Sequence, residues 1–335
     1  MDNPFLVEVT RGPLVESRHR GSVSVVDADG STVLSIGDVD RRVFPRSAVK
    51  ALQALPLLES GAADKYGLTD EEIALACASH SGEPEHVRVA RSMLAKAGCD
   101  VGCLECGTHW PMGEAANRAL AAAGEAPSAL HNNCSGKHAG FICLACGSGE
   151  DPKGYVSPNH PVQRMVREAL EDATGACHTM ENSGVDGCSI PTYAIPLPSL
   201  AFGFAKFGAG HGLSGQGKAA AERIRKAVAA HPFMVAGTGR FDTRLMEILK
   251  ARAFVKVGAE GVYCAALPEL GYGIALKADD GNSRAAEAVM AGLILRYLPL
   301  GEEERTAVKA LAQPVFRNWN GIEVGGLRLT PALMG

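Results

Sequence analysis

The sequence has no long run of basic residues and no long apolar segment. Its 33 lysines and arginines stand against 37 aspartates and glutamates, giving a net charge of −4, and no five basic residues follow one another. Nucleic acids and anionic membrane surfaces are therefore poor candidate partners. No apolar stretch is long enough to span a bilayer. We expect a protein that binds neither nucleic acid nor membranes.

The first residues, MDNPFLVEVT, lack the charged and then apolar pattern of a secretory signal. Internal repeats and low-complexity linkers are absent as well. With 46% hydrophobic and 21% charged residues, the composition is that of a globular protein. We therefore expect a cytoplasmic chain that forms one catalytic unit over residues 1–335, compact or with two tightly packed lobes.

Strand patterns occur at both ends of the chain. β-Branched residues alternate on either side of DADG (27–30), which predicts a hairpin within residues 5–37. Over residues 45–253, apolar residues recur every three or four positions, as on helices. Strand patterns then return, followed by a helix over SRAAEAVMAGLILRYL and a closing strand in IEVGGLRLT. The prediction is an α/β (α+β) fold, with a sheet lobe from residues 1–44 and 254–335 and a mainly helical lobe, 45–253, between them.

Ten cysteines are many for a chain without a secretory signal. In a reducing compartment they are more often buried thiols, metal ligands or catalytic groups than disulfides. Two CxxC pairs, Cys103 with Cys106 and Cys143 with Cys146, resemble the halves of a zinc ribbon, but the gap between them is long for one module. Because GFICLACG also continues an apolar helix, we favour small core residues over metal ligands.

A serine and a lysine share one predicted helical turn in FPRSAVKAL. Ser47 and Lys50 have SxxK spacing, so the hydroxyl and the amine lie on one helix face. A helix N-terminus and burial both disfavour a charged amine, and a neutral lysine can take the proton of a serine. The alternative is an exposed helix on which the two meet by chance, and so short a motif does not decide between them.

CASHSGEPEH places Ser79, His80 and Ser81 in the turn that ends another helix. Loops that carry function have this composition, although ordinary helix capping produces it too.

Thiols and an amine come together in two further turns. HNNCSGKHAG (131–140) contains Cys134 and Lys137, and Cys188 follows VDG. Two thiolates from separate turns could hold zinc, with lysine as a rare third ligand. Free buried cysteines are an equal alternative on spacing alone.

Taken together, the motifs resemble the asparaginase II family, the Rhizobium etli type of L-asparaginase. The matching stretches follow the family's order from about Val9 to the end: FPRSAVKALQALPLLESGAAD, CASHSGEPEHV, HNNCSGKHAGF, GVDGCSIPTYAIPLPSLA, HPFMVAGTGRFDTRLM and KVGAEGVYCAALPELGYGIALKADDGNSRA. The resemblance implies a fold similar to serine β-lactamases and glutaminases, and a homodimer. It implies hydrolysis of L-asparagine to L-aspartate and ammonia.

The resemblance also implies roles for particular residues. The catalytic set is two Ser–Lys pairs, Ser47 with Lys50 and Ser79 with Lys256, and Lys277 competes for the last position. The metal set is a zinc site, structural or substrate-orienting, on Cys134, Lys137 and Cys188, with no organic cofactor. The residues expected to line the pocket are Arg46, Ser81, Asn133, His138 and Asp186. Arg46 suits the α-carboxylate of the substrate, and Asp186 its α-ammonium group.

Three other functions stay open. A glutaminase of the same fold would differ chiefly in pocket length. A penicillin-recognising acylase would share SxxK but would normally be exported. A non-enzymatic zinc-binding adaptor would hydrolyse nothing, so relative rates on asparagine, glutamine and a β-lactam separate all three from an asparaginase.

Overall fold

The computed structural model describes residues 2–213 and 215–334. The chain divides into two compact units. The sheet unit consists of Met1–Ala48, Ile195–Ala209 and Ile248–Gly335, and the helical unit of Val49–Ala194 and Gly210–Glu247. In the part of the chain that is described, no helix is long and apolar enough to cross a membrane.

The sheet unit is built from both ends of the chain. Its strands are β1 (Phe5–Arg11), β2 (Leu14–Asp27), β3 (Thr32–Ile36), β6 (Phe254–Val257), β7 (Val262–Leu267), β8 (Tyr272–Ala278), β9 (Val315–Arg317) and β10 (Glu323–Leu329). Its helices are α9 (Leu197–Ala209), α13 (Ser283–Tyr297), α14 (Glu302–Ala312), α15 (Pro331–Met334) and the 3₁₀ turn η5 (Lys250–Arg252).

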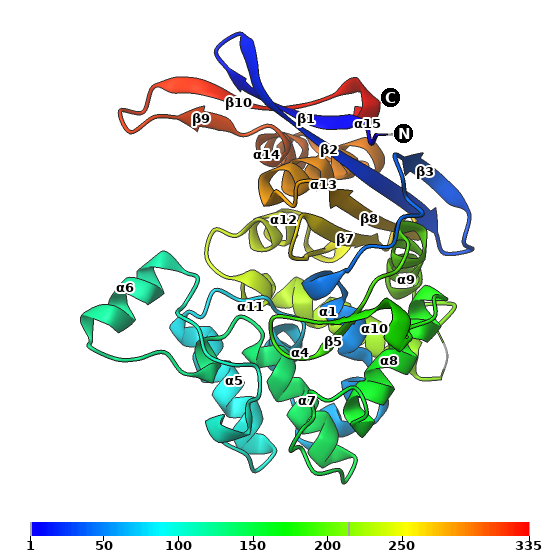
Figure 1. Ribbon diagram of the computed structural model, residues 1–335, viewed down its shortest axis with the longest axis vertical. Coiled ribbons are helices and arrows are strands. Elements are labelled where there is room, and N and C mark those ends of the chain that lie inside the picture. The colour runs from blue at the N-terminus through cyan, green and yellow to red at the C-terminus, as the bar shows by residue number, and fades with distance from the viewer. Residues whose placement is uncertain (1, 214, 335) are drawn as a thin grey trace. The chain divides into compact units, whose positions relative to one another are not determined.

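Eight strands form one antiparallel sheet in the order β6-β7-β8-β2-β1-β10-β9, with β3 paired to β2. Strand β1 pairs with β10, so the blue N-terminal strand lies beside the red C-terminal one (Figure 1). At the β2–β3 turn, the Asp27 carboxylate accepts hydrogen bonds from the backbone N–H groups of Asp29 and Ser31. The predicted hairpin, the sheet from both termini, the helix α13 and the closing strand β10 are confirmed.

Helix α9 belongs to the sheet unit, although the sequence placed it within the helical lobe of 45–253. It packs against β2, β7 and β8. A side chain at Gly273 of β8 would collide with the backbone carbonyl oxygen of Ala201 in α9, so glycine is what permits this close approach. Helical periodicity identified the helix but carried no information on which unit it covers.

The helical unit contains α1 (Lys50–Gln53), α2 (Leu55–Glu59), α3 (Ala62–Lys65), α4 (Asp70–Ala76), α5 (Pro84–Lys96), α6 (Glu114–Ala122), α7 (Ser135–Gly147), α8 (Pro161–Thr174), α10 (Gly217–Ala230) and α11 (Pro232–Ala236). Its smaller elements are the 3₁₀ turns η2 (Val101–Cys103), η3 (Ala129–His131) and η4 (Met180–Asn182) and the two-stranded sheet of β4 (Ser183–Val185) and β5 (Pro191–Tyr193). The turn η1 (Arg46–Val49) and helix α12 (Phe241–Leu249) each contain residues of both units.

Helix α7 forms the centre of the helical unit. Every residue from Ser135 to Ala145 is buried, and the helix packs against α2, α3, α4, α5 and α8. A side chain at Gly136 would collide with the backbone carbonyl oxygen of Leu75 in α4. The first turn of α7 is thereby fixed against α4, just before the turn that carries Ser79.

Candidate active site

The amine of Lys50 lies deep in the helical unit. The side chain is 0% exposed, and its Nζ donates to the Ala78 carbonyl oxygen at 2.5 Å, to Ser79 Oγ at 2.9 Å and to Cys134 Sγ at 3.1 Å. A hydroxyl this close to a lysine amine can pass its proton to the amine when the amine is neutral. The structure thus brings Lys50 to Ser79, the serine that the resemblance pairs with Lys256.

The turn that carries Ser79 is held on both sides. The backbone N–H of Ser79 donates to the Val235 carbonyl oxygen at 2.9 Å, and that of His80 donates to the Asn133 carbonyl oxygen at 3.1 Å. The His80 ring is 0% exposed and bonds Ser135 Oγ and the Gly82 backbone N–H, so both of its nitrogens have structural partners. His80 therefore holds the turn that carries Ser79 in place.

Two thiols and a second buried amine lie beside the first. Cys134 precedes α7 directly and Lys137 lies in its first turn. The Lys137 Nζ contacts Cys188 Sγ at 3.0 Å, and both side chains are buried. The Cys134 and Cys188 thiols also hydrogen-bond each other. The structure thus brings Lys137 to Cys188 in this unit, and a zinc site on Cys134, Lys137 and Cys188 stays a prediction.

The charges of this group compensate one another. The hydrogen bond from Cys188 holds the pKa of Cys134 well below its usual range against the cost of burial, with help from the charges of Lys50 and Lys137. The same hydrogen bond, together with burial, raises the pKa of Cys188. Burial lowers the pKa of Lys137, but its thiol neighbours outweigh burial, and the net shift is upward. The pKa values of the two thiols are therefore shifted in opposite directions.

Cys134, Cys188 and Lys137 form a donor set of two sulfurs and one nitrogen, which suits zinc better than magnesium or calcium. Among the described residues, no three histidine, cysteine, aspartate or glutamate side chains form a metal-binding group. A metal at this position would therefore depend on the lysine amine as its third protein ligand, after loss of the amine proton.

The ring of His138 presents a hydrogen-bond donor that has no partner among the residues that the structure describes. Its Nδ1 lies 2.6 Å from the Tyr155 hydroxyl, which itself accepts a hydrogen bond from the Glu105 backbone N–H at 2.9 Å. The hydroxyl proton therefore points to Nδ1, and the imidazole proton is left on Nε2. Within the described part of the chain, the buried Nε2 has no hydrogen-bond partner. Burial, and then the charges of Lys137 and Lys50, hold the pKa of His138 well below its usual range, so the ring is neutral.

Tyr155 is a buried hydrogen-bond partner of His138 that sequence reasoning missed. It is 0% exposed and fixes the tautomer of His138 across 17 positions of sequence. It lies in the turn before α8, outside every motif. In the sequence, Tyr155 is recognisable only as an aromatic residue in an otherwise polar turn. That pattern is too common to predict a role in a site.

The other pocket residues of this unit have backbone or local roles. Asn133 Oδ1 accepts from Cys134 Sγ at 3.4 Å, and its backbone N–H donates to His109 Nε2 at 2.9 Å. Ser81 Oγ donates to the Ala236 carbonyl oxygen at 2.9 Å, so Ser81 is buried in a backbone contact. Asp186 contributes to the raised pKa of Lys137 through its charge.

Arg46, Ser47 and Lys256 lie in the sheet unit. Arg46 has a φ of 52°, in the left-handed region that a non-glycine residue rarely occupies, directly before Ser47. Lys256, on β6, is 0% exposed and donates to the Val257 carbonyl oxygen at 3.0 Å. A side chain at Gly258 would approach the Pro45 carbonyl oxygen to 2.5 Å, so the chain after β6 passes close to the start of η1.

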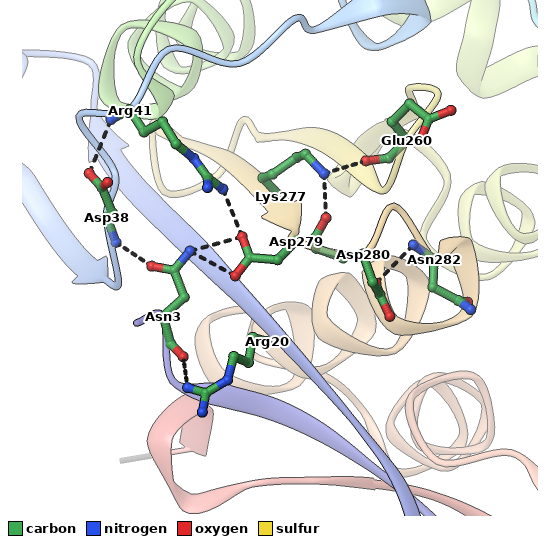
Figure 2. Close-up of polar contacts among 10 residues, drawn as sticks. Asn3, Arg20, Asp38, Arg41, Glu260, Lys277, Asp279, Asp280 and Asn282 are labelled. Atoms are coloured by element: carbon green, nitrogen blue, oxygen red, sulfur yellow. Dashed lines mark hydrogen bonds and ion pairs between the residues drawn. The ribbon is translucent and has the colours of Figure 1, made fainter. Parts of the chain in front are cut away.

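The competing lysine, Lys277 on β8, is bound in a different way. Figure 2 shows its amine turned toward the Glu260 carbonyl oxygen, at 2.7 Å, and it also donates to the Ala278 carbonyl oxygen. Beside it, the Asp279 carboxylate accepts from Asn3 at 2.9 Å and from Arg41 at 2.7 Å (Figure 2). Burial lowers the pKa of Lys277. The two carbonyl bonds suit a lysine that fixes the loop at Glu260.

The two CxxC motifs do not form a zinc ribbon. Cys143 is fully buried and donates to the Met93 carbonyl oxygen at 3.5 Å, as expected of a core residue. Cys106 is buried and donates to the Ala129 carbonyl oxygen at 3.6 Å. The four cysteines are not among any metal-binding group of the described residues. The preference for core residues therefore agrees with the structure for these two, while Cys103 and Cys146 remain partly exposed.

Two solved structures illustrate what the chain is similar to. A β-lactamase from Mycobacterium bovis shares 13% identity and a TM-score of 0.45, over 87% of this chain and 94% of that one. The protein Mglu in its native form shares 14% identity and a TM-score of 0.37, over 80% of this chain and 62% of that one. Comparison with curated proteins found no match.

A family model settles the relationship. The model described as L-asparaginase II matches residues 7–329. This range contains every serine, lysine, cysteine and histidine placed above in the candidate site, and nearly the whole chain of 335 residues. The chain belongs to the L-asparaginase II family.

Proposed function

We propose that the protein hydrolyses L-asparagine to L-aspartate and ammonia through a serine nucleophile. The family supports an enzyme that cleaves an amide of a small molecule. The single observation that carries the proposal is the buried amine of Lys50 at 2.9 Å from the Ser79 hydroxyl. An apolar side chain would fill this buried position better than an amine does, so packing alone does not explain Lys50. A buried amine does supply the base that serine acylation needs.

The reaction has two steps. In the pairing that the family resemblance implies, Ser47 attacks the side-chain amide carbon of asparagine and its proton passes to Lys50. Lys50 then gives this proton to the departing nitrogen, the C–N bond breaks, and ammonia leaves. The resulting β-aspartyl ester is then hydrolysed by water, activated through Ser79 and Lys256, which releases aspartate and restores the serine.

The remaining polar groups bind the substrate. Arg46 suits its α-carboxylate and Asp186 its α-ammonium group. The neutral His138, with its free Nε2–H, suits an oxygen acceptor of the substrate, because a buried donor gains most from a partner that replaces water. Asn133 and Ser81 complete the polar lining.

A zinc ion held by Cys134, Lys137 and Cys188 is part of the proposal. When bound, such an ion orients a loop or a substrate group, and its charge is largely neutralised by two thiolates, so it is a weak Lewis acid. The residues themselves hold the first turn of α7 to the turn at Cys188 through the 3.0 Å contact of Lys137 with Cys188. From the family resemblance we also propose a homodimer and a cytoplasmic location.

We predict that Cys188→Ala abolishes stoichiometric zinc binding, because two of the three donors cannot hold the ion alone. We expect the variant to bind asparagine more weakly while its free energy of unfolding changes little, since a unit with this much buried surface does not depend on one metal for its stability. Elemental analysis of purified wild type and variant measures the zinc. The matched control is Cys103→Ala, which should keep it. Zinc that persists in Cys188→Ala and disappears from Cys103→Ala would reject the assignment.

The experiment that tests the function is a parallel assay of three substrates. Ammonia release from asparagine and from glutamine, and ring opening of a chromogenic β-lactam, are measured on one preparation. We expect asparagine to be turned over with a kcat/KM at least about 100-fold above that of glutamine, the discrimination that a pocket shaped for one methylene less can give. Faster hydrolysis of glutamine or of the β-lactam would replace the proposed substrate, and no hydrolysis at all would favour a binding protein.

A further inference from the structure

No residue of the proposed reaction lies in the motif HPFMVAGTGRFDTRLM (231–246). Part of this motif nevertheless lies against the turn that carries Ser79. The Ser79 backbone N–H donates to the Val235 carbonyl oxygen at 2.9 Å, and Ser81 Oγ donates to the Ala236 carbonyl oxygen at 2.9 Å. We call residues 235–238 the 235–238 segment. It consists of the last two residues of α11 and the two that follow, and it belongs to the helical unit, as the turn does.

A carboxylate joins the far end of this segment to the same turn. Glu83 Oε1 accepts a hydrogen bond from the Thr238 backbone N–H at 2.8 Å, and Oε2 accepts one from the Thr238 hydroxyl at 2.6 Å. Hydrogen bonds to a carboxylate are about twice as strong as those between neutral groups. Thr238 is exposed, so packing contributes little to its position and the two bonds to Glu83 contribute most.

The backbone between these contacts comes too close to the turn for a side chain. Gly237 has a φ of 114°, a conformation that favours glycine. A Cβ atom there would approach Glu83 Oε1 to 2.4 Å and Ser81 Oγ to 2.8 Å. From α12, the Thr243 hydroxyl donates to the Gly237 carbonyl oxygen at 2.8 Å. Glycine at this position therefore lets the 235–238 segment lie directly against Ser81 and Glu83.

His86 adds a link in the first turn of α5. The Glu83 backbone N–H donates to His86 Nδ1 at 3.2 Å, so the imidazole proton lies on Nε2. This Nε2–H donates to the Phe233 carbonyl oxygen at 3.1 Å. The His86 ring is buried and stacks on the ring of Phe233, with centroids 4.6 Å apart. The start of α5 is thus bound to the motif through both the backbone and the side chain of Glu83.

We propose that Glu83 is a positioning residue for Ser79. Its two bonds to Thr238 keep the 235–238 segment against the turn, and the backbone bond from Ser79 to that segment fixes Ser79 in turn. The Ser79 hydroxyl is thereby held 2.9 Å from the amine of Lys50. This role rests on the proposed function, in which Ser79 helps to activate the water that hydrolyses the ester.

Steady-state kinetics distinguishes positioning from a merely structural role, since Glu83 is also the N-cap residue of α5. Glu83→Ala removes both bonds to Thr238. We expect kcat for asparagine to fall about 100-fold, the effect of a small misplacement of a reacting group. KM should not rise, because the groups proposed to bind the α-carboxylate and the α-ammonium group are unchanged. The ester on Ser47 should accumulate, since its hydrolysis is the step that needs Ser79.

Two further variants serve as rescue and control. Glu83→Gln keeps both contacts, because its amide oxygen accepts from the Thr238 N–H and its NH₂ group donates to the hydroxyl. Its kcat should stay within about 5-fold of the wild type, the cost of exchanging a charged partner for a neutral one. Glu85→Ala changes an exposed glutamate of the same helix turn and should leave kcat unchanged. Equal kcat in Glu83→Ala and Glu85→Ala, equal losses in Glu83→Ala and Glu83→Gln, or a raised KM with unchanged kcat would each overturn the proposal.

Thr238 tests the same contact from its other side, and decides alone if Glu83→Ala does not fold. Thr238→Val removes only the hydroxyl bond, and Thr238→Ser keeps it. Because Thr238 is exposed, both variants should fold. We expect kcat to fall about 10-fold in Thr238→Val, the effect of one hydrogen bond to a charged group, and to stay unchanged in Thr238→Ser. Equal kcat in the two variants would contradict the role of Glu83.

Amide hydrogen exchange separates a failure of this role from a failure of the proposed function. In Glu83→Ala, the backbone amides of Ser79 and of the 235–238 segment should exchange faster than in the wild type, and in Glu85→Ala they should not. An unchanged rate at Ser79 in Glu83→Ala would overturn the positioning role whatever the substrate is. If the wild type releases no ammonia from asparagine, the proposed function fails, and the exchange rates alone decide the role of Glu83.

Discussion

Ser47→Ala is expected to reduce kcat/KM for asparagine about 10⁴-fold or more, because it removes the atom that forms the covalent intermediate. The fold should be unaffected, since Ser47 is partly exposed and the change removes one oxygen. The measurement is ammonia release under steady-state conditions, with thermal unfolding of both proteins alongside. The matched control is Ser35→Ala, an exposed serine of β3 in the same unit, which should keep full activity.

Ser79→Ala separates the two candidate nucleophiles. Because Ser79 Oγ accepts from Lys50 Nζ at 2.9 Å, its removal should also slow the reaction, but a β-aspartyl ester should still form on Ser47. Rapid acid quenching and peptide mass spectrometry detect that ester. A Ser47→Ala enzyme that retains more than a few per cent of wild-type kcat, or an ester found on Ser79, would transfer the role of nucleophile to Ser79.

Lys50→Met should lower kcat about 10²- to 10⁴-fold, the usual contribution of a general base. Methionine matches the length of lysine but cannot accept a proton. The variant also loses three hydrogen bonds, to Ala78, Ser79 and Cys134, and leaves the Ala78 carbonyl oxygen without this donor. We expect a loss of about 1–3 kcal/mol in the free energy of unfolding. Steady-state kinetics and urea unfolding measure the two effects separately.

Lys65→Met is the control for that change. Lys65 is an exposed lysine of the same unit whose amine also donates to backbone carbonyl oxygens, those of Cys146 and Gly147. Its replacement should alter stability slightly and kcat not at all. Equal losses of kcat in the two variants would mean that the helical unit responds to any missing lysine, and Lys50 would lose its assignment as base.

Local patterns predicted the elements well, because local interactions form them. The hairpin at Asp27 follows from alternating β-branched residues and a turn that a carboxylate can cap. The SxxK motif correctly marked the start of a helical segment, now η1 and α1. The sheet from both termini followed from the distribution of strand patterns along the chain.

Contacts between distant positions could not be predicted in the same way. Lys50 meets Ser79 across 29 positions and His138 meets Tyr155 across 17, and no periodicity links these pairs. The packing of turns against helices decides both contacts.

Strand alternation could not separate Lys256 from Lys277 either. Lys256 on β6 is opposite Cys264 on β7, and Cys264 is opposite Ala275 on β8. Lys277 follows Ala275 by two residues, so both lysines project from the same face of the sheet. Only burial tells them apart, since Lys256 is 0% exposed and Lys277 is partly exposed. Burial depends on which elements cover each end of the strands, and the strand sequences alone do not predict that.

The pairing of β1 with β10 has a consequence for biosynthesis. Strand β1 is complete at Arg11, but its partner β10 ends at Leu329, so β1 lacks this neighbour in the nascent chain until Leu329 has been synthesised. At about 5–20 residues per second, the wait is on the order of 15–60 s. During that time one edge of β1 is open to pairing with other chains, the exposure that ribosome-associated chaperones relieve. The last residue of the helical unit is Glu247, so this unit can fold before β10 has been synthesised.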